Sequence, residues 1–215
     1  MRTERRRTMK LISPYERIEY IESNGSSYID TGIYGSDSLD IEISIHYTYK
    51  NSIFFFASRL SAQDFTYTLV GDAGRTHIRF DYNNTLNVLG YYIDKITIRK
   101  SGLSVYINNT WKLGVYKGKF TTPSTLLLFG ILQNGVVNSS PAGGKVYFLK
   151  MKENGVLVRD FVPVKRNSDG AIGMYDLVGK KFYTSPNGVA FSGGVKSKVF
   201  IASLFESAMA ERRVA

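Results

Sequence analysis

Residues 163–176, PVKRNSDGAIGMYD, form the densest group of side chains that could do chemistry. Two cations, two carboxylates and two glycines fall within fourteen residues, between apolar runs. Such a set could cradle a phosphate or supply an acid and a base. Residues 167–170 are strong turn formers, however, and no helix follows them for a phosphate loop to open. We therefore predict a turn between two strands, with Lys165, Arg166 and both carboxylates at its solvated rim.

Few residues could hold a metal ion. The chain has no cysteine, which excludes disulfides, thiolate metal sites and thiol nucleophiles. The two histidines, His46 and His77, lack the close spacing of zinc ligands, so we expect ordinary strand residues. Loops at residues 23–25 and 71–74 could supply some oxygen ligands to calcium, which needs about six or more. The sequence thus predicts no cofactor and leaves a calcium site open.

The elements that would position these groups are strands. In LDIEISIHYTY one face carries isoleucines and the other carries polar side chains, among them Asp40 and Glu42. ITIRKSGLSVYINN predicts two strands joined by a turn at residues 100–102, and STLLLFGIL predicts one continuous buried strand. Turn residues recur about every 8 to 12 positions, and no amphipathic helix interrupts residues 15–194. We predict an all-β, two-sheet antiparallel sandwich over that range.

The net charge of +10 is concentrated at the two ends of the chain. Residues 1–14 form a basic arm whose cations are Arg2, Arg5, Arg6, Arg7 and Lys10. The arm could neutralise nucleic-acid phosphates or fit an acidic groove of a protein. Because the body lacks a basic face with interleaved aromatic residues, we expect a protein partner and consider nucleic acid disfavoured.

Residues 195–215 differ from the body in their periodicity. Apolar side chains recur at i, i+3, i+4 and i+7, as Ile201, Leu204, Phe205 and Ala208. This spacing predicts a short helix with one apolar stripe. The helix could pack on its own sandwich or on a neighbouring subunit. With the basic arm, these four residues are our candidates for anchoring the protein in an oligomeric assembly.

The start of the chain does not resemble a secretory signal. MRTERRRTMKLIS has a basic run but no apolar stretch after it. No window approaches about 18 consecutive apolar residues, so we expect no membrane span. We expect a protein made in the bacterial cytoplasm.

Three blocks of sequence resemble one family. They are YERIEYIESNGSSYIDTGI near the start, the hairpin DKITIRKSGLSVYINNTW, and GKVYFLKMKENGVLVRDFVPVKRNSDGAIGMYDLVGKKFYTSPNGVAFSGG near the end. These blocks are similar to the concanavalin A-like, or laminin-G-like, jelly-roll domains of bacteriophage virion proteins and gut-bacterial surface proteins. The resemblance covers residues 15–194 and implies a two-sheet jelly roll. It also implies attachment to glycans, host surfaces or other virion subunits, with no catalytic set.

The arm and the C-terminal helix depart from a bare family module and favour a subunit built into an assembly. We therefore expect a non-enzymatic virion structural protein, either a capsid decoration protein or a subunit of a tail or fibre appendage. A glycan-binding adhesin module on the surface of a gut bacterium is the alternative, and a glycoside hydrolase is a third hypothesis. Relatives of this sandwich that cleave glucans carry three carboxylates on one strand face. Here Asp40 and Glu42 are followed on that face by Ser44 and His46, so the third carboxylate is missing.

Glycan binding requires an aromatic platform, because a sugar has an apolar face and a rim of hydroxyl groups. The candidates are Tyr34 in TGIYGSD, Tyr91 and Tyr92 in LGYYID, and Trp111 after INNT. Packing within the core or between strands is the competing interpretation for each of them.

Overall fold

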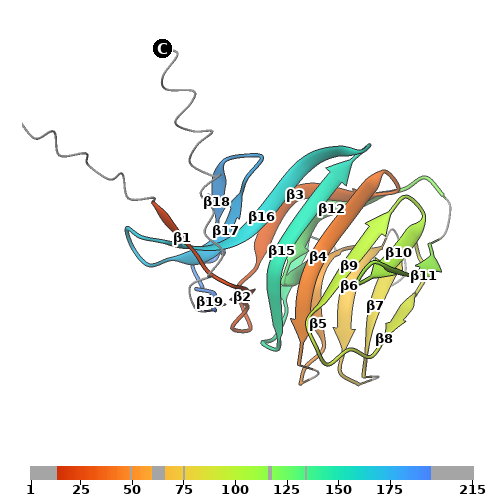
Figure 1. Cartoon of the computed structure of the whole chain (residues 1–215), viewed down its shortest axis with the longest axis horizontal. Coiled ribbons are helices and arrows are strands. Elements are labelled where there is room, and N and C mark those ends of the chain that lie inside the picture. Colours follow the sequence, from red (N-terminus) through yellow and green to blue (C-terminus); the bar gives the residue numbers. More distant parts are fainter. Residues whose placement is uncertain are drawn as a thin grey trace, which may run out of the picture.

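The computed structural model describes residues 14–194, apart from positions 49, 60–65, 75, 116–117 and 134. All regular structure in the described residues is β, and its strands form two sheets that pack face to face (Figure 1). The predicted all-β, two-sheet antiparallel sandwich is therefore confirmed. The predicted C-terminal helix and all cations of the basic arm lie outside the described residues.

The large sheet has eleven strands. Its main path runs β11 (Thr110–Gly114), β10 (Ser104–Ile107), β9 (Ile96–Ser101), β4 (Leu39–Tyr47), β15 (Gly144–Glu153), β16 (Val156–Arg166), β17 (Ile172–Asp176) and β18 (Lys181–Tyr183). Three short strands join it: β1 (Tyr15–Arg17) pairs with β16, β2 (Ile21–Glu22) pairs with β15, and β19 (Ser192–Gly193) pairs with β2. All of these pairs are antiparallel.

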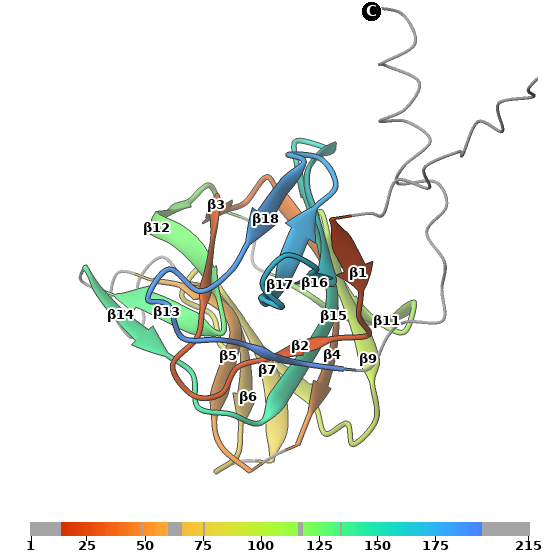
Figure 2. The same ribbon diagram turned by 90° about the vertical axis from the view of Figure 1, so that its left-hand side faces the viewer.

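The small sheet has eight strands. Its path runs β14 (Val136–Ser139), β13 (Gly130–Gln133), β5 (Ile53–Ser58), β6 (Tyr67–Asp72), β7 (His77–Tyr82) and β8 (Val88–Gly90). β12 (Thr121–Leu128) joins β5 to β3 (Ile29–Ser36). One bridge between β13 and β5 is parallel. Figure 2 shows the sandwich turned by 90°. Strands β15 and β9 of the large sheet lie on the opposite side from β13 and β14 of the small sheet.

Two predicted strand boundaries are wrong. The apolar run STLLLFGIL is not one strand, because Phe129 adopts a left-handed conformation (φ 58°) and separates β12 from β13. The chain therefore reverses direction after β12, which is antiparallel to β5, and β13 then runs beside β5 in the parallel direction. The hairpin turn lies at Gly102 (φ 55°) and Leu103, so Lys100 is a strand residue of β9.

The core lies between the sheets, where strand alternation predicted it. On β4 the isoleucines are buried, while Asp40, Glu42 and His46 on the other face are half-buried. Five rings of one cluster pack with centroids 4.9 to 6.3 Å apart: Phe56, Tyr67, Phe80, Tyr82 and Phe120. Full burial of one such side chain is worth about 1.5–3 kcal/mol.

A lysine is buried in this core. Because β9 alternates, Lys100 follows Ile96 and Ile98 onto the inner face and is 0% exposed. Its ammonium donates to the carbonyl oxygens of Leu39 (2.6 Å) and Asp37 (3.1 Å) and to the Asp40 carboxylate (3.3 Å). Asp37 lies in the turn from β3 into β4, and Leu39 and Asp40 begin β4, so the lysine holds the segment through which the chain passes from the small sheet to the large one.

Burial affects the ionisable groups around this lysine. It lowers the pKa of Lys100, against the opposing attraction of Asp40. It also raises the pKa of Tyr82 to about 12, and the Lys100 ammonium lies 5.3 Å from the centroid of that ring. Tyr67 donates its hydroxyl to the carbonyl of Leu39 (2.8 Å), and burial raises its pKa well above the usual value. The polar groups of this core are thus arranged around the carbonyl of Leu39.

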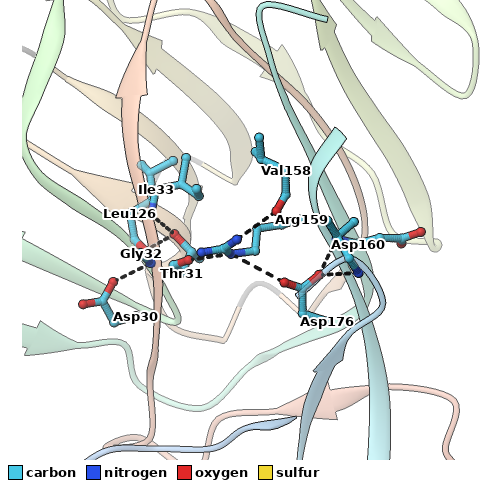
Figure 3. A network of polar contacts seen from close by, with 10 residues as sticks. Asp30, Thr31, Gly32, Ile33, Leu126, Val158, Arg159, Asp160 and Asp176 are labelled. Carbon is cyan, nitrogen blue, oxygen red and sulfur yellow. Dashed lines mark hydrogen bonds and ion pairs between the residues drawn. The ribbon is translucent and has the colours of Figure 1, made fainter. Parts of the chain in front are cut away.

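A network of polar contacts around Arg159 connects the two sheets (Figure 3). Arg159 of β16 donates from Nε to the carbonyl of Thr31 on β3 (3.0 Å), and from Nη1 to that of Val158 (2.8 Å). Its Nε lies 3.7 Å from Oδ2 of Asp176, which is completely buried. Oδ1 of Asp176 accepts the backbone N–H groups of Asp160 (2.9 Å) and Val178 (3.1 Å). The expectation that Asp176 lies at a solvated rim is therefore wrong: it is a structural carboxylate where β17 ends.

We predict that Asp176→Ala lowers the free energy of unfolding by about 3 kcal/mol, because two part-buried backbone N–H groups lose their acceptor and the buried carboxylate no longer pairs with Arg159. Asp176→Asn keeps an oxygen for both groups, so it should cost about half as much. Urea unfolding of both variants measures the difference. Equal losses in the two variants would show that these hydrogen bonds are not the source of the stability.

Candidate binding surfaces

The stretch at residues 163–176 contains the predicted turn. β16 and β17 pair with Val164 opposite Gly173, and the turn closes with Gly170 in a left-handed conformation (φ 74°). Arg166 and Asp169 form a bidentate ion pair across the turn. Nε of Arg166 donates to Oδ1 of Asp169 (2.9 Å), and Nη2 donates to Oδ2 (2.6 Å). Asp169 is exposed, and the hydrogen bond from Arg166 lowers its pKa to about 2. These groups stabilise the turn, and we assign them no chemistry.

The two carboxylates of β4 face cations on both neighbouring strands. Glu42 lies opposite Lys150 of β15 and Arg99 of β9. Asp40 lies opposite Lys152 and accepts from Lys100 and from the backbone N–H of Gly102 (2.8 Å). The side chains of Asp40, Glu42, Arg99, Lys150 and Lys152, with Ser101, line a depression on the outer face of the large sheet. The alternation of charge is that of a solvated strand face.

This charged face continues into an aromatic edge. Directly opposed residues on six neighbouring strands form a single line, which we call the outer-face row: Asp160, Lys150, Glu42, Arg99, Tyr106 and Trp111. With strands about 4.8 Å apart, the row is about 24 Å long. It therefore presents charged groups at one end and two rings at the other.

Trp111 is the sequence candidate that belongs to this row. Its side chain is 59% exposed on β11, the edge strand of the large sheet. Tyr106 lies opposite it, and the guanidinium of Arg99 stands 4.3 Å from the Tyr106 ring centroid. Sequence reasoning missed Tyr106 and Arg99. The alternation of ITIRKSGLSVYINN could have indicated them, because it places both on the face opposite the buried isoleucines.

The other aromatic candidates lie elsewhere. Tyr34 is 50% exposed on β3, which belongs to the small sheet. Tyr91 is 59% exposed just after β8. Tyr92 packs against the core and donates its hydroxyl to the carbonyl of Leu89 (3.1 Å), as the packing interpretation predicted. Lys112 of β11 stands 5.7 Å from its ring centroid, so Tyr92 lies near the row without being part of it.

The candidate metal ligands do not come together. His46 lies on β4 of the large sheet and His77 on β7 of the small sheet. In the loop at residues 71–74, Asp72 pairs with Arg79 (3.2 Å). Gly71 packs under Tyr47, where a Cβ would come within 2.5 Å of the ring. Among residues 14–194, as far as they are described, no three His, Cys, Asp or Glu side chains are grouped to hold a metal ion.

Comparison with known proteins does not identify a family. No protein-family model matches the chain, and no curated protein has a significantly similar sequence. In the described part of the chain no helix is long and apolar enough to cross a membrane.

We predict that Asp169 titrates with a pKa of about 2 and that Arg166→Gln moves this value towards 3.8. Because the folded-state pKa is lowered, the carboxylate stabilises the turn above its unfolded pKa and loses that effect as the pH falls through about 2. Carboxyl ¹³C shifts followed by NMR report the titration. The matched variant Lys165→Gln should leave the pKa unchanged, and an equal response to both substitutions would contradict the assignment to Arg166.

Proposed function

We propose that this protein is a non-enzymatic structural protein of a bacteriophage particle, as a capsid decoration protein or a subunit of a tail or fibre appendage. Its sandwich faces outward and attaches to surface glycans, while its two tails anchor it to other subunits. The outer-face row carries the attachment part of this proposal. The resemblance of residues 15–194 to virion jelly-roll domains supports the location in a particle.

The row has the chemistry that a linear glycan needs. Trp111 offers a ring face to the apolar side of a sugar, and the guanidinium of Arg99 lies over the neighbouring Tyr106 ring. Glu42 and Asp160 accept hydrogen bonds from hydroxyl groups, and Arg99 and Lys150 donate them. Since every group comes from a paired strand, the surface is held in shape before a ligand arrives, which lowers the ordering cost of binding.

The surroundings of the carboxylates favour binding over glycoside cleavage. Glycosidases need one carboxylic acid and one carboxylate on opposite sides of the scissile bond. Here Glu42 faces Arg99 and Lys150, and Asp40 accepts from Lys100. Each carboxylate thus lies beside cations of the neighbouring strands, as on a solvated strand face.

The same row would equally suit an adhesin module on a bacterial surface, which is the second candidate. Glycan binding alone does not separate the two. Attachment to a particle through the tails does, because only the virion proposal requires it.

We expect the protein to bind surface polysaccharides of a host bacterium saturably on a glycan array. Trp111→Ala should weaken this binding at least about tenfold, or about 1.4 kcal/mol, because it removes the most exposed ring of the row. Tyr34→Ala is the matched control, since it removes a similarly exposed ring from the small sheet. Unchanged affinity in Trp111→Ala, or an equal loss in both variants, would contradict the role of the row.

Deletion of residues 1–10 together with residues 196–215 should greatly reduce incorporation of the protein into phage particles. The deletion leaves both sheets complete, so circular dichroism of the purified variant should retain its β signal. Co-sedimentation with particles is the measurement. Undiminished incorporation would show that the tails are not the anchors.

A further inference from the structure

One edge of the small sheet is an exposed strand whose outer side has no partner strand in the described part of the chain. β14 ends the path of that sheet and pairs only with β13, from Val136 opposite Gln133 to Ser139 opposite Gly130. It lies at the left margin of the sandwich in Figure 2. In an antiparallel strand the backbone groups point alternately to the two sides, so some N–H and C=O groups of β14 point away from β13. The strand is therefore open to pairing with a further strand.

The side chains of β14 are uncharged and largely exposed. Val136 is 59% exposed and Val137 is 38% exposed, and Asn138 is exposed as well. At the end of the strand the hydroxyl of Ser139 donates to the carbonyl of Gly25 (3.3 Å), so the open part of the edge is residues 136–138. An exposed apolar edge without a charge is a template on which another chain can add a strand.

Other edges of the two sheets carry features that hinder such pairing. β11 and β18, which end the path of the large sheet, carry Lys112 and Lys181. β3 carries Asp30, and the guanidinium of Arg159 binds the carbonyl of its Thr31 (3.0 Å). β8 has three residues, and its pairing with β7 is irregular. Charges, covered backbone groups and irregular pairing are the usual protection of a sheet edge, and β14 carries no charge of this kind.

The absence of charge on β14 also indicates what its partner is. A twofold contact between identical strands brings each side chain close to its own copy, so a charged edge repels itself. In a chain of net charge +10, two copies can meet along β14 without opposing like charges. Asn138 suits the same arrangement, because its amide has both donors and an acceptor and so complements its own copy. We propose that β14 pairs antiparallel with β14 of a second copy of this chain, which joins the two small sheets into one.

This contact is independent of the proposed function. β14 belongs to the small sheet, whereas the outer-face row lies on the large sheet, and the tails take no part in the pairing. Four residues from each copy bury less surface than a standard protein interface, so we expect a weak dimer that forms reversibly. In an assembly of many copies, such a contact adds to attachments made elsewhere, because linked weak contacts reinforce one another.

The test measures the molar mass of the full chain by sedimentation velocity, from low to high micromolar concentration. The fraction of dimer should rise with concentration. Hydrogen exchange of the amides at residues 136–139 should slow as the dimer forms, since outward N–H groups then gain an acceptor. A protein that stays monomeric over this range, or a dimer that leaves this exchange unchanged, would overturn the proposal.

Charged variants of Val137 locate the contact. Val137→Lys and Val137→Glu each place like charges on the two copies, so each alone should weaken the dimer about tenfold. An equimolar mixture of the two should regain it, because opposite charges then meet across the contact. Val156→Lys is the matched control, since it adds a lysine at a 66% exposed valine of β16 and should dimerise as the wild type does.

The same measurements contain the contrary outcomes. All three substitutions are at exposed positions, so circular dichroism and the melting temperature should match the wild type. Wild-type dimerisation of Val137→Lys, or an equal loss in Val156→Lys, would show that β14 is not the contact. A mixture that stays monomeric would show that the substitutions act within one copy, and it would also overturn the proposal.

Discussion

The structure depends on the mutual cover of two apolar sheet faces. Neither the isoleucine face of β4 nor the aromatic face of β6 and β7 could remain in water, and each is the other's only extensive cover among the described elements. Burial of such faces is the dominant favourable term in folding. Everything polar in the interior must then satisfy its hydrogen bonds within the protein. The ammonium of Lys100 and one carboxylate oxygen of Asp176 do so by binding backbone groups of neighbouring segments of the chain.

The same constraint explains where exposed rings and charges occur. The inner faces of the two sheets pack against each other, so exposed rings and charges can lie only on the outer faces and at the sheet edges. On the large sheet this produces the outer-face row, whose charges alternate from strand to strand and end in two rings. On the small sheet it leaves Arg79 paired with Asp72 and Asp81, close to Arg59. The two faces thus differ in chemistry: one is open and charged, and the other is shielded and neutral in sum.

Much of the fold could be predicted from the sequence, and the reasons are local. The alternation in LDIEISIHY predicted which side of β4 is buried, and the turn formers at residues 167–170 predicted the β16–β17 turn. Predictions failed where a single residue departs from the local pattern. Phe129 interrupts an apolar run through its backbone conformation, and Lys100 was assigned to a turn because a charged residue beside Ser101 and Gly102 suggests one. Of the residues in the outer-face row, Trp111 was a candidate from the sequence, while Tyr106 and Arg99 were not.

By itself the sequence determined the class of the fold, since a period of two and frequent turns leave few alternatives to an antiparallel sandwich. The tertiary structure alone decided which strands are neighbours and in what register. That register places Trp111 beside Tyr106 and Arg99, opposes Thr68 to Asp81, and brings Arg159 to the carbonyl of Thr31. Of these contacts, the last joins strands far apart in the chain, and the others depend on where each strand pair begins. No local pattern specifies such pairings, because they result from packing the whole sandwich at once.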